Sequence, residues 1–208
     1  MAKLVLYVTN PKVEDMFLIP SIINENSDQV IVVTSKVEVQ EKLTNNDIDL
    51  IICDRATFLL TEEQINLVEG NCFNIHPSFL PHNRGYYPNF WSAYDQTPSG
   101  VTIHNIDPNI DSGKIVAQTR IHFKDRETLR TSYYKLRELS VSLFKSIYPC
   151  ISEGLCLESL IDNPSNIGRT NYKADFEGVY ESLPKGWDTT IAEVQSLALK
   201  VNFKRKED

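Results

Sequence analysis

Short apolar runs alternate with segments of helical spacing along the first half of the chain. Continuous apolar runs of this kind are typical of strands that are buried on both faces of a sheet. The runs predicted to be strands are residues 4–8, 29–33, 48–53 and 71–74. The segments predicted to be helices are residues 13–23, 36–43 and 61–70. Strands and helices that alternate at this spacing predict a parallel sheet covered by helices.

The second half of the chain continues with longer elements. A short helix is predicted at residues 87–94, and we expect its aromatic face to pack rather than to stack on a ligand. Two further strands, residues 101–104 and 114–121, are joined by the polar loop 105–113 and should be neighbours in the sheet. Residues 127–148 should form the longest helix. Weaker patterns predict a strand at 155–160, a turn at 163–164 and a helix at 189–201.

These elements predict an α/β fold, with a Rossmann-like, mostly parallel twisted sheet and helices on both faces. We assign residues 1–150 to one domain and residues 151–208 to a short C-terminal extension with a hairpin and a helix. Within the extension, residues 169–176 fit a small hairpin, a homodimer contact or a surface extension. Ligands of such sheets bind outside the carboxyl ends of the strands, so functional residues are expected there.

Composition and charge narrow the class of protein. The chain has 208 residues and a net charge of −7, which disfavours a nucleic-acid backbone or an anionic membrane as partner. No apolar run approaches the roughly 20 residues that span a bilayer, and the first residues resemble a strand rather than a signal peptide. Cys53 and Cys72 lie within apolar runs, and the four cysteines form no Cys-x-x-Cys pair. We therefore expect a reduced, cytoplasmic protein.

Asn74 and His76 are the first candidates for chemistry. They stand two residues apart at the end of a predicted strand, so their side chains point the same way, and Pro77 holds His76 extended. A carboxamide and an imidazole on one face can stabilise an oxyanion and move a proton. A polar strand end with a structural histidine would give the same pattern, so the pair needs a third residue to define a site.

Asp111 is the candidate for that third residue, although an Asp before Ser-Gly is also an ordinary turn residue. His104, on a predicted buried strand, fits a core histidine as well as a functional one. A metal site made of His76, His104 and Asp111 would lack the spacing of metal-ligand motifs, so we expect no metal. The segment Thr9–Lys12 after the first strand contains no glycine and therefore lacks the phosphate cradle of a dinucleotide site.

Several motifs that follow one another along the chain together resemble one family. They are Asn74-Ile75-His76-Pro77-Ser78, Leu80-Pro81, Arg84-Gly85, Gly100-Val101-Thr102-Ile103-His104 and Asp111-Ser112-Gly113-Lys114-Ile115. In this combination the sequence resembles the folate-dependent formyltransferases. That family includes glycinamide ribonucleotide transformylase, the catalytic domain of methionyl-tRNA formyltransferase and the nucleotide-sugar N-formyltransferases. The resemblance is clear from residue 48 to residue 148 and extends over residues 4–33 only as a strand pattern.

The resemblance implies that residues 1–150 form a formyltransferase catalytic domain in which Asn74, His76 and Asp111 are catalytic. It implies 10-formyltetrahydrofolate as the formyl donor, in a cleft between the loops 54–60 and 107–111. The implied folate contacts are Phe58, Leu59, Leu60, His104, Asp107, Ile110 and Asp111. When an amine attacks the formyl carbon, Asn74 would donate to the oxyanion. His76 would donate to it or protonate the departing nitrogen, and Asp111 would bias the charge of the imidazole.

The resemblance also narrows the acceptor. The segment Thr9–Lys12 lacks the glycines with which the purine enzyme grips its phosphate, and the negative charge and short extension disfavour a tRNA acceptor. The implied acceptor is a nucleotide-linked amino sugar, for example a dTDP-4-amino-4,6-dideoxyhexose of lipopolysaccharide or glycan biosynthesis, bound near Arg84, Tyr86 and Tyr87. Phosphoribosylglycinamide formylation and non-catalytic binding of folate or a nucleotide are the alternatives.

Overall fold

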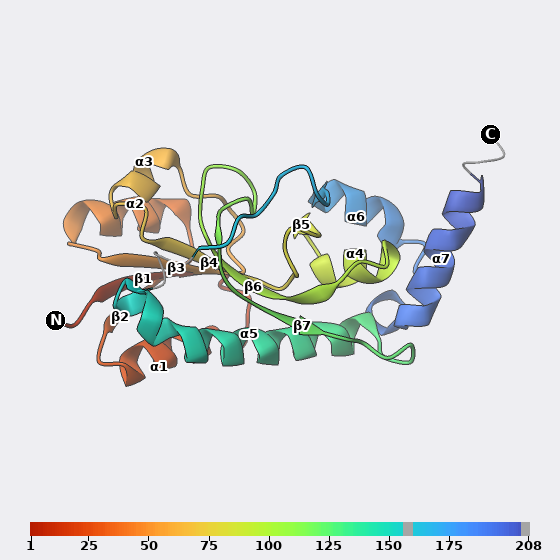
Figure 1. Cartoon of the computed structure of the whole chain (residues 1–208), viewed down its shortest axis with the longest axis horizontal. Helices are drawn as coiled ribbons and strands as arrows, with labels where there is room; N and C mark the ends of the chain where they lie inside the picture. The colour runs from red at the N-terminus through yellow and green to blue at the C-terminus, as the bar shows by residue number, and fades with distance from the viewer. Residues whose placement is uncertain (156–159, 205–208) are drawn as a thin grey trace.

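A six-stranded sheet forms the centre of the computed structural model, which describes residues 1–155 and 160–204 (Figure 1). The strands are β1 (Leu4–Thr9), β2 (Gln29–Val33), β3 (Leu50–Asp54), β4 (Cys72–His76), β6 (Ser99–Asn105) and β7 (Ile115–Ile121). Their order across the sheet is β2-β1-β3-β4-β6-β7. The first four are parallel, whereas β6 runs antiparallel to both β4 and β7. The predicted mostly parallel sheet is confirmed, and so is the pairing of the two strands around the loop 105–113.

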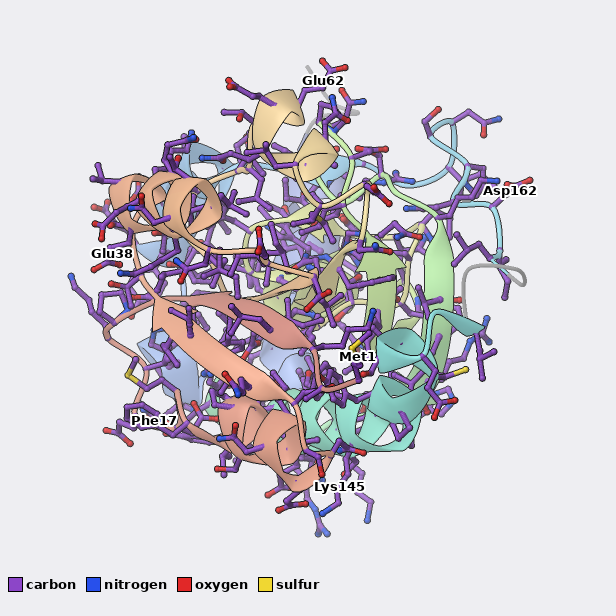
Figure 2. The ribbon with its side chains drawn as sticks, turned by 90° about the vertical axis from the view of Figure 1, so that its left-hand side faces the viewer. Met1, Phe17, Glu38, Glu62, Lys145 and Asp162 are labelled. Atoms are coloured by element: carbon purple, nitrogen blue, oxygen red, sulfur yellow. The ribbon has the colours of Figure 1, made fainter. Side chains whose placement is uncertain are left out.

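Helices cover both faces of this sheet, and further helices lie beside it. The helices are α1 (Leu18–Glu25), α2 (Lys36–Asn45), α3 (Glu62–Asn66), α4 (Pro88–Tyr94), α5 (Leu129–Ser152), α6 (Lys173–Tyr180) and α7 (Ile191–Lys204). Figure 1 and Figure 2 show α2 and α3 on one face and α1 and α5 on the other. In Figure 2, Glu38 and Glu62 mark the first pair of helices, and Phe17 and Lys145 mark the second. None of the helices within residues 1–155 and 160–204 is long and apolar enough to cross a membrane.

Capping boxes explain where three of the helices begin. The side chains of Ser35, Thr61 and Thr128 each accept a hydrogen bond from the backbone amide three residues further on, and the side chain of that residue caps in return. These helices start close to the predicted positions. By contrast, α1 begins at Leu18 instead of residue 13, because turns follow Pro11 and the N-cap residue, Phe17, offers no side-chain oxygen.

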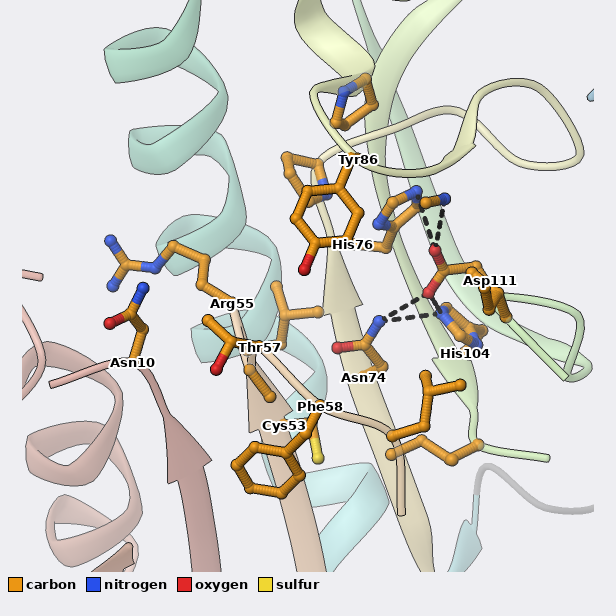
Figure 3. A pocket seen from close by; sticks show the side chains of 18 of the residues that line it. Asn10, Cys53, Arg55, Thr57, Phe58, Asn74, His76, Tyr86, His104 and Asp111 are labelled. Carbon is orange, nitrogen blue, oxygen red and sulfur yellow. Dashed lines mark hydrogen bonds and ion pairs between the residues drawn. The ribbon is translucent and has the colours of Figure 1, made fainter. Parts of the chain in front are cut away.

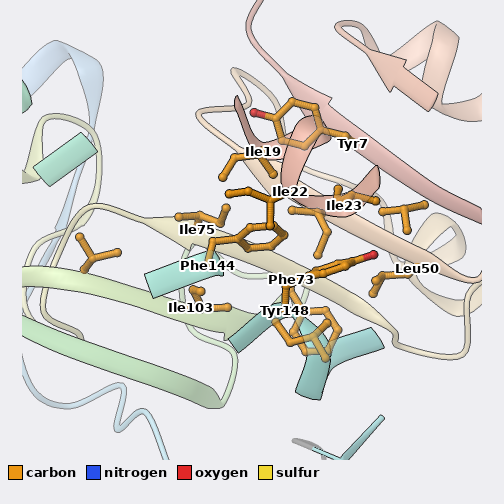
Figure 4. Close-up of a cluster of buried hydrophobic side chains, with 14 of the residues drawn as sticks. Tyr7, Ile19, Ile22, Ile23, Leu50, Phe73, Ile75, Ile103, Phe144 and Tyr148 are labelled. Atoms are coloured by element: carbon orange, nitrogen blue, oxygen red, sulfur yellow. The ribbon is translucent and has the colours of Figure 1, made fainter. Parts of the chain in front are cut away.

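The side chains of β1 contribute alternately to two cores, because successive residues of a strand point to opposite faces. Val5 and Tyr7 join the core under α1 and α5, which Figure 4 shows with Phe144 of α5 at its centre. Leu6 and Val8 join the core under α2 and α3. Both faces of the strand are therefore apolar, which explains its uninterrupted apolar run.

The part of the chain that follows α5 pairs with the earlier part through two short parallel strands. These are β5 (Arg84–Gly85) and β8 (Thr170–Asn171). Residues 169–176 therefore do not form the hairpin that was one of the alternatives, because β8 pairs with β5 and α6 follows it directly. The strand predicted at residues 155–160 falls mainly on residues 156–159, which lie outside the described residues.

A third core joins α4 to the C-terminal helices. Phe90 and Trp91 of α4 pack with Phe176 of α6 and Val194 of α7. The ring centroids of Phe90 and Phe176 lie 5.1 Å apart in an edge-to-face arrangement, which is favourable for aromatic pairs. The prediction that the aromatic face of residues 87–94 packs in the protein is confirmed.

Candidate active site

Four polar side chains meet where β4 ends beside the antiparallel strand β6 (Figure 3). Asn74 and His76 come from β4, and the register that pairs Asn74 with His104 brings the histidine of β6 beside them. Asp111 comes from the loop between β6 and β7, where a φ of 47° places it in the left-handed region. The three residues expected to be catalytic are therefore neighbours, with His104 as a fourth member. In the described part of the chain, no group of three His, Cys, Asp or Glu residues is arranged to hold a metal ion.

The carboxylate of Asp111 lies at the centre of this cluster. Its Oδ1 accepts a hydrogen bond from Nδ2 of Asn74 over 3.0 Å and lies 3.5 Å from Nε2 of His104. Its Oδ2 accepts from the backbone amide of Gly85 over 2.8 Å and lies 3.6 Å from Nε2 of His76. Burial alone would raise the pKa of Asp111, but the two imidazoles and the Gly85 amide outweigh burial and hold this pKa well below its usual range. The carboxylate is therefore ionised at neutral pH.

Both amide hydrogens of Asn74 are used within the cluster. Nδ1 of His104 donates to the carbonyl oxygen of Asn105 over 2.6 Å, and in the tautomer that carries its hydrogen on Nδ1 the Nε2 atom is an acceptor. Nδ2 of Asn74 lies 3.2 Å from this Nε2 and gives its other hydrogen to Asp111. The amide oxygen of Asn74 consequently faces the pocket (Figure 3). In this arrangement the amide oxygen of Asn74 can accept a hydrogen bond, and its expected donation to an oxyanion stays a prediction.

His76 uses one ring nitrogen within the protein and leaves the other for a ligand. Nε2 donates to the carbonyl oxygen of Asn83 over 3.2 Å, and Nδ1 has no hydrogen-bond partner among the described residues. Burial lowers the pKa of His76, Asp111 opposes this effect without cancelling it, and the nearby His104 and Arg84 add to the lowering. At neutral pH the ring is therefore uncharged, and its Nδ1 can accept a proton.

A pocket of about 420 Å³ opens onto the cluster. The residues expected to contact folate all line it: Phe58, Leu59, Leu60, His104, Asp107, Ile110 and Asp111. Tyr86 and Tyr87, expected on the acceptor side, also line it. Tyr87 packs on Phe176 with 4.0 Å between ring centroids, whereas Tyr86 is 41% exposed. Tyr86 is therefore the tyrosine of this pair that a ligand can contact more fully.

Arg84 has a different place from the one expected. Its side chain is buried and does not line the pocket. Nε donates to the backbone oxygen of Asp111, Nη1 to the carbonyl oxygen of Ile167, and Nη2 to Oδ1 of Asn163 and the carbonyl oxygen of Pro164. The guanidinium is thus occupied by the protein itself. The expected substrate contact is replaced by a structural role, which a motif could not reveal because most of these partners lie far away in the sequence.

Sequence reasoning missed Arg55, which lies across the pocket from Asp111 (Figure 3). Arg55 directly follows β3 with a φ of 56°, and Asn10 directly follows β1, the parallel neighbour of β3. The strand order reverses between β1 and β3, and open α/β sheets bind ligands at such a reversal. The signal that could have revealed Arg55 was a cationic residue immediately after a buried strand.

A partly buried ion cluster holds Arg55 in place. Nη2 of Arg55 lies 2.8 Å from Asp15 and 3.3 Å from Asp54. Arg137 of α5 pairs with both carboxylates, and its Nη1 lies 2.9 Å from Asp54. Tyr7 also donates a hydrogen bond to Asp54 over 2.8 Å. Two arginines thus balance two carboxylates in a setting where an unpaired charge would be costly.

The sequence was also compared with protein families and with curated proteins. The family model described as formyl transferase matches residues 12–147. The dTDP-4-amino-4,6-dideoxyglucose formyltransferase of Mycobacterium tuberculosis (strain ATCC 25618 / H37Rv) is 34% identical over 112 residues, which cover 53% of this chain and 47% of the relative. The chain thus spans about half the length of the curated relative it matches.

Solved structures share the fold. The formyltransferase PseJ from Anoxybacillus kamchatkensis, in complex with UDP-4,6-dideoxy-4-formamido-L-AltNAc and tetrahydrofolate, is 27% identical with a TM-score of 0.79 over 92% of this chain and 97% of that one. A sugar N-formyltransferase from a Shewanella species is 21% identical with a TM-score of 0.73 over 94% of this chain and 87% of that one, a likeness of fold alone. Because the family match covers more than half of the residues, this chain belongs to the formyl transferase family.

Proposed function

We propose that this chain transfers a formyl group from 10-formyltetrahydrofolate to the amine of a nucleotide-linked amino sugar. The polarity of the pocket is the observation that carries the proposal. Among the described residues that line the pocket, Arg55 is the one arginine or lysine, and it lies across from the loop that carries Asp107 and Asp111. An acceptor with an amine at one end and phosphates at the other matches this separation of charge.

The apolar part of the pocket supports a folate as co-substrate. Phe58 and Leu60 come from the loop after β3, and Ile106 and Ile110 come from the loop after β6. Apolar walls with a few polar groups at one end suit a flat ring system that is recognised by its edge. When bound there, 10-formyltetrahydrofolate supplies the formyl carbon beside Asn74 and His76.

The cluster around Asp111 gives each catalytic residue a task. Oδ1 of Asn74 accepts an N–H of the amine, which holds the nitrogen lone pair toward the formyl carbon. Nδ1 of His76 takes the proton that the nitrogen loses as the new C–N bond forms. The ionised Asp111, whose Oδ2 lies 3.6 Å from Nε2 of His76, stabilises the resulting imidazolium by its charge, and Nδ1 of His76 can then deliver the proton to the departing nitrogen.

The relatives support this class of acceptor. The Mycobacterium tuberculosis relative is named for a dTDP-linked 4-amino sugar, and PseJ is solved with a UDP-linked 4-formamido sugar. Glycinamide ribonucleotide also joins an amine to a phosphate and is the second candidate. The absence of glycine from Thr9–Lys12 disfavours it, since a phosphate held by backbone amides needs close approach of the chain.

We also propose that the enzyme works in the cytoplasm on small molecules, without nucleic acid or membrane. The net charge of −7 supports the absence of polyanionic partners. Cys53, Cys72 and Cys150 are free thiols, as is usual in a reducing compartment. We propose in addition that the protein forms a homodimer, and that residues 1–150 are the catalytic domain and residues 151–208 an extension.

The test is a panel of acceptors incubated with 10-formyltetrahydrofolate and followed by mass spectrometry. The panel holds dTDP- and UDP-linked 4-amino-4,6-dideoxyhexoses, glycinamide ribonucleotide and a reaction without acceptor. We expect a formyl group on an amino sugar, and its loss in Asn74→Ala. Formylation of glycinamide ribonucleotide alone would replace the proposal with the purine reaction, and folate binding without any transfer would indicate a binding protein.

A further inference from the structure

The backbone oxygen of Asp111 is held by two side chains from distant parts of the chain. It accepts hydrogen bonds from Nδ2 of Asn163 over 2.9 Å and from Nε of Arg84 over 3.1 Å. The two donors also bond to each other, because Nη2 of Arg84 donates to Oδ1 of Asn163 over 2.8 Å. Nδ2 of Asn163 additionally donates to the backbone oxygen of Gly113 over 3.0 Å. Three residues therefore form a closed triangle of hydrogen bonds on the Asp111 loop.

Asn163 belongs to residues 161–171, a segment that we call the strap; it follows α5 along the chain and leads into α6 (Figure 1). Ile161 begins the strap by exchanging two backbone hydrogen bonds with Ile115 of β7. Asn171 ends it by accepting a hydrogen bond from the backbone amide of Tyr86 over 2.9 Å. The strap is therefore fixed at one end to β7 and at the other to Tyr86, which lines the pocket, and Asn163 lies between these two anchors.

Asp111 needs support of this kind for two reasons. A φ of 47° is unfavourable for a residue with a side chain and persists only where the surroundings hold it. Its carboxylate must also reach Nδ2 of Asn74 and stay beside Nε2 of His76. Without the Asn163 donor, the loop backbone can relax toward an ordinary conformation, and such a rotation would turn the carboxylate away from both residues.

We propose that Asn163 is a positioning residue for Asp111, so that the strap is part of the catalytic machinery. The inference rests on the proposed function, because it takes Asp111 to be catalytic. Asn163 does not line the pocket, so it acts on the reaction through Asp111 and makes no contact with substrate.

Two substitutions distinguish the positioning of Asp111 by Asn163 from a role in which Asn163 only attaches the strap to Arg84. Asn163→Ala removes the donor to Asp111 and Gly113 without changing any charge. Asn163→Asp keeps an oxygen for Arg84 but turns its other oxygen toward those carbonyls, so it retains the anchor and loses the donor. Asn166→Ala is the matched control, because Asn166 is an exposed residue of the strap whose side chain makes no hydrogen bond within the described residues.

We expect kcat to fall about 10- to 100-fold in both Asn163 variants, since small misplacements of a catalytic group have effects of this size. The KM values for both substrates should stay near those of the wild type, as should every parameter of Asn166→Ala. Wild-type kcat in Asn163→Asp would show that the strap needs only its attachment to Arg84, and this would overturn the proposal.

A second measurement does not depend on activity. The titratable and charged groups that face His76 are Asp111, His104 and Arg84, and Asp111 is the one that raises its pKa. Displacing the carboxylate in Asn163→Ala should therefore lower the pKa of His76 further, as followed by NMR titration of its ring in the free protein. This result is independent of whether any acceptor is formylated. A wild-type titration of His76 in folded Asn163→Ala would overturn the proposal.

Discussion

Nδ2 of Asn74 donates to Oδ1 of Asp111 over 3.0 Å, and this bond determines which end of the Asn74 amide faces the pocket. Because the carboxylate can only accept, the amide nitrogen must point to it and the amide oxygen must point away. The orientation of Asn74 thus follows from the charge of Asp111, and a change at either residue should affect both.

Asn74→Asp is expected to be nearly inactive. The new carboxylate would lie against that of Asp111, so one of the two would have to hold a proton, and the hydrogen bond that orients the amine would change. We expect kcat to fall about 100-fold or more, measured as formylated product by mass spectrometry. Asn109→Ala is the control, because Asn109 lines the same pocket and only its backbone forms hydrogen bonds within the described residues. Equal losses in the two variants would contradict the role of Asn74.

The rate should depend on pH through His76. The pKa of His76 lies below its ordinary value of 6.5, and only the uncharged ring can take a proton from the amine. The contribution of His76 to kcat should therefore be complete above pH 6.5 and be lost as the pH drops through the lowered pKa. A profile that loses activity mainly above pH 7 would contradict the base role.

The free energy of unfolding should also fall as the pH drops below 6.5. In the unfolded chain His76 takes up a proton near pH 6.5, whereas the folded protein does so only at a lower pH. Between these values the unfolded state binds more protons, so the free energy of unfolding falls as the pH decreases. Urea denaturation between pH 7 and pH 5 should show this fall, and the fall should be smaller in His76→Gln.

Removal of Arg55 should weaken binding of the acceptor. Arg55→Gln alone would leave Asp15 short of a partner, so the test uses Arg55→Gln with Asp15→Asn and compares it with Asp15→Asn alone. Loss of a charge-assisted hydrogen bond of about 1.5–3 kcal/mol should raise the KM for the nucleotide sugar about 10- to 100-fold. The KM for the folate co-substrate should change little. An unchanged acceptor KM would place the phosphates elsewhere.

Arg137→Met should destabilise the protein strongly. It leaves Asp54, which is 2% exposed, without its partner from α5, and breaking a buried ion pair at one side costs about 3–5 kcal/mol. Arg130→Met is the matched control on the same helix, because Arg130 pairs with Asp188 at the surface and such pairs contribute little. The free energy of unfolding from urea titration should fall in the first variant and stay near that of the wild type in the second.

Local signals made much of the fold predictable. The apolar run of β1 and the caps at Ser35, Thr61 and Thr128 each act within a few residues, so a sequence displays them directly. The parallel pair of β5 and β8 could not be predicted this way. Each strand is too short to leave a pattern, and the pair exists only because distant segments meet.

The residues of the candidate site likewise fall into those that a local sequence signal reveals and those that depend on distant contacts. Asn74 and His76 were visible because a spacing of two places side chains on one face of a strand, whereas Asp111 depended on the family resemblance. The partners of Arg84 were invisible, since Asn163 is 79 residues away in the chain. Arg55 carried a local signal, namely a charge directly after a buried strand, and its partners Asp15 and Arg137 did not.

The triangle of hydrogen bonds on Asp111 also has a consequence for the order in which parts of the chain fold. Asn163 and Asp111 are separated by 52 residues, so their contact closes a long loop, whereas the helix caps close within a single turn. The loop that carries Asp111 should therefore reach its final shape late, after the sheet has formed. On the ribosome, a chain whose strap has not yet emerged would carry Asn74, His76 and Asp111 while the carboxylate of Asp111 is still unaligned.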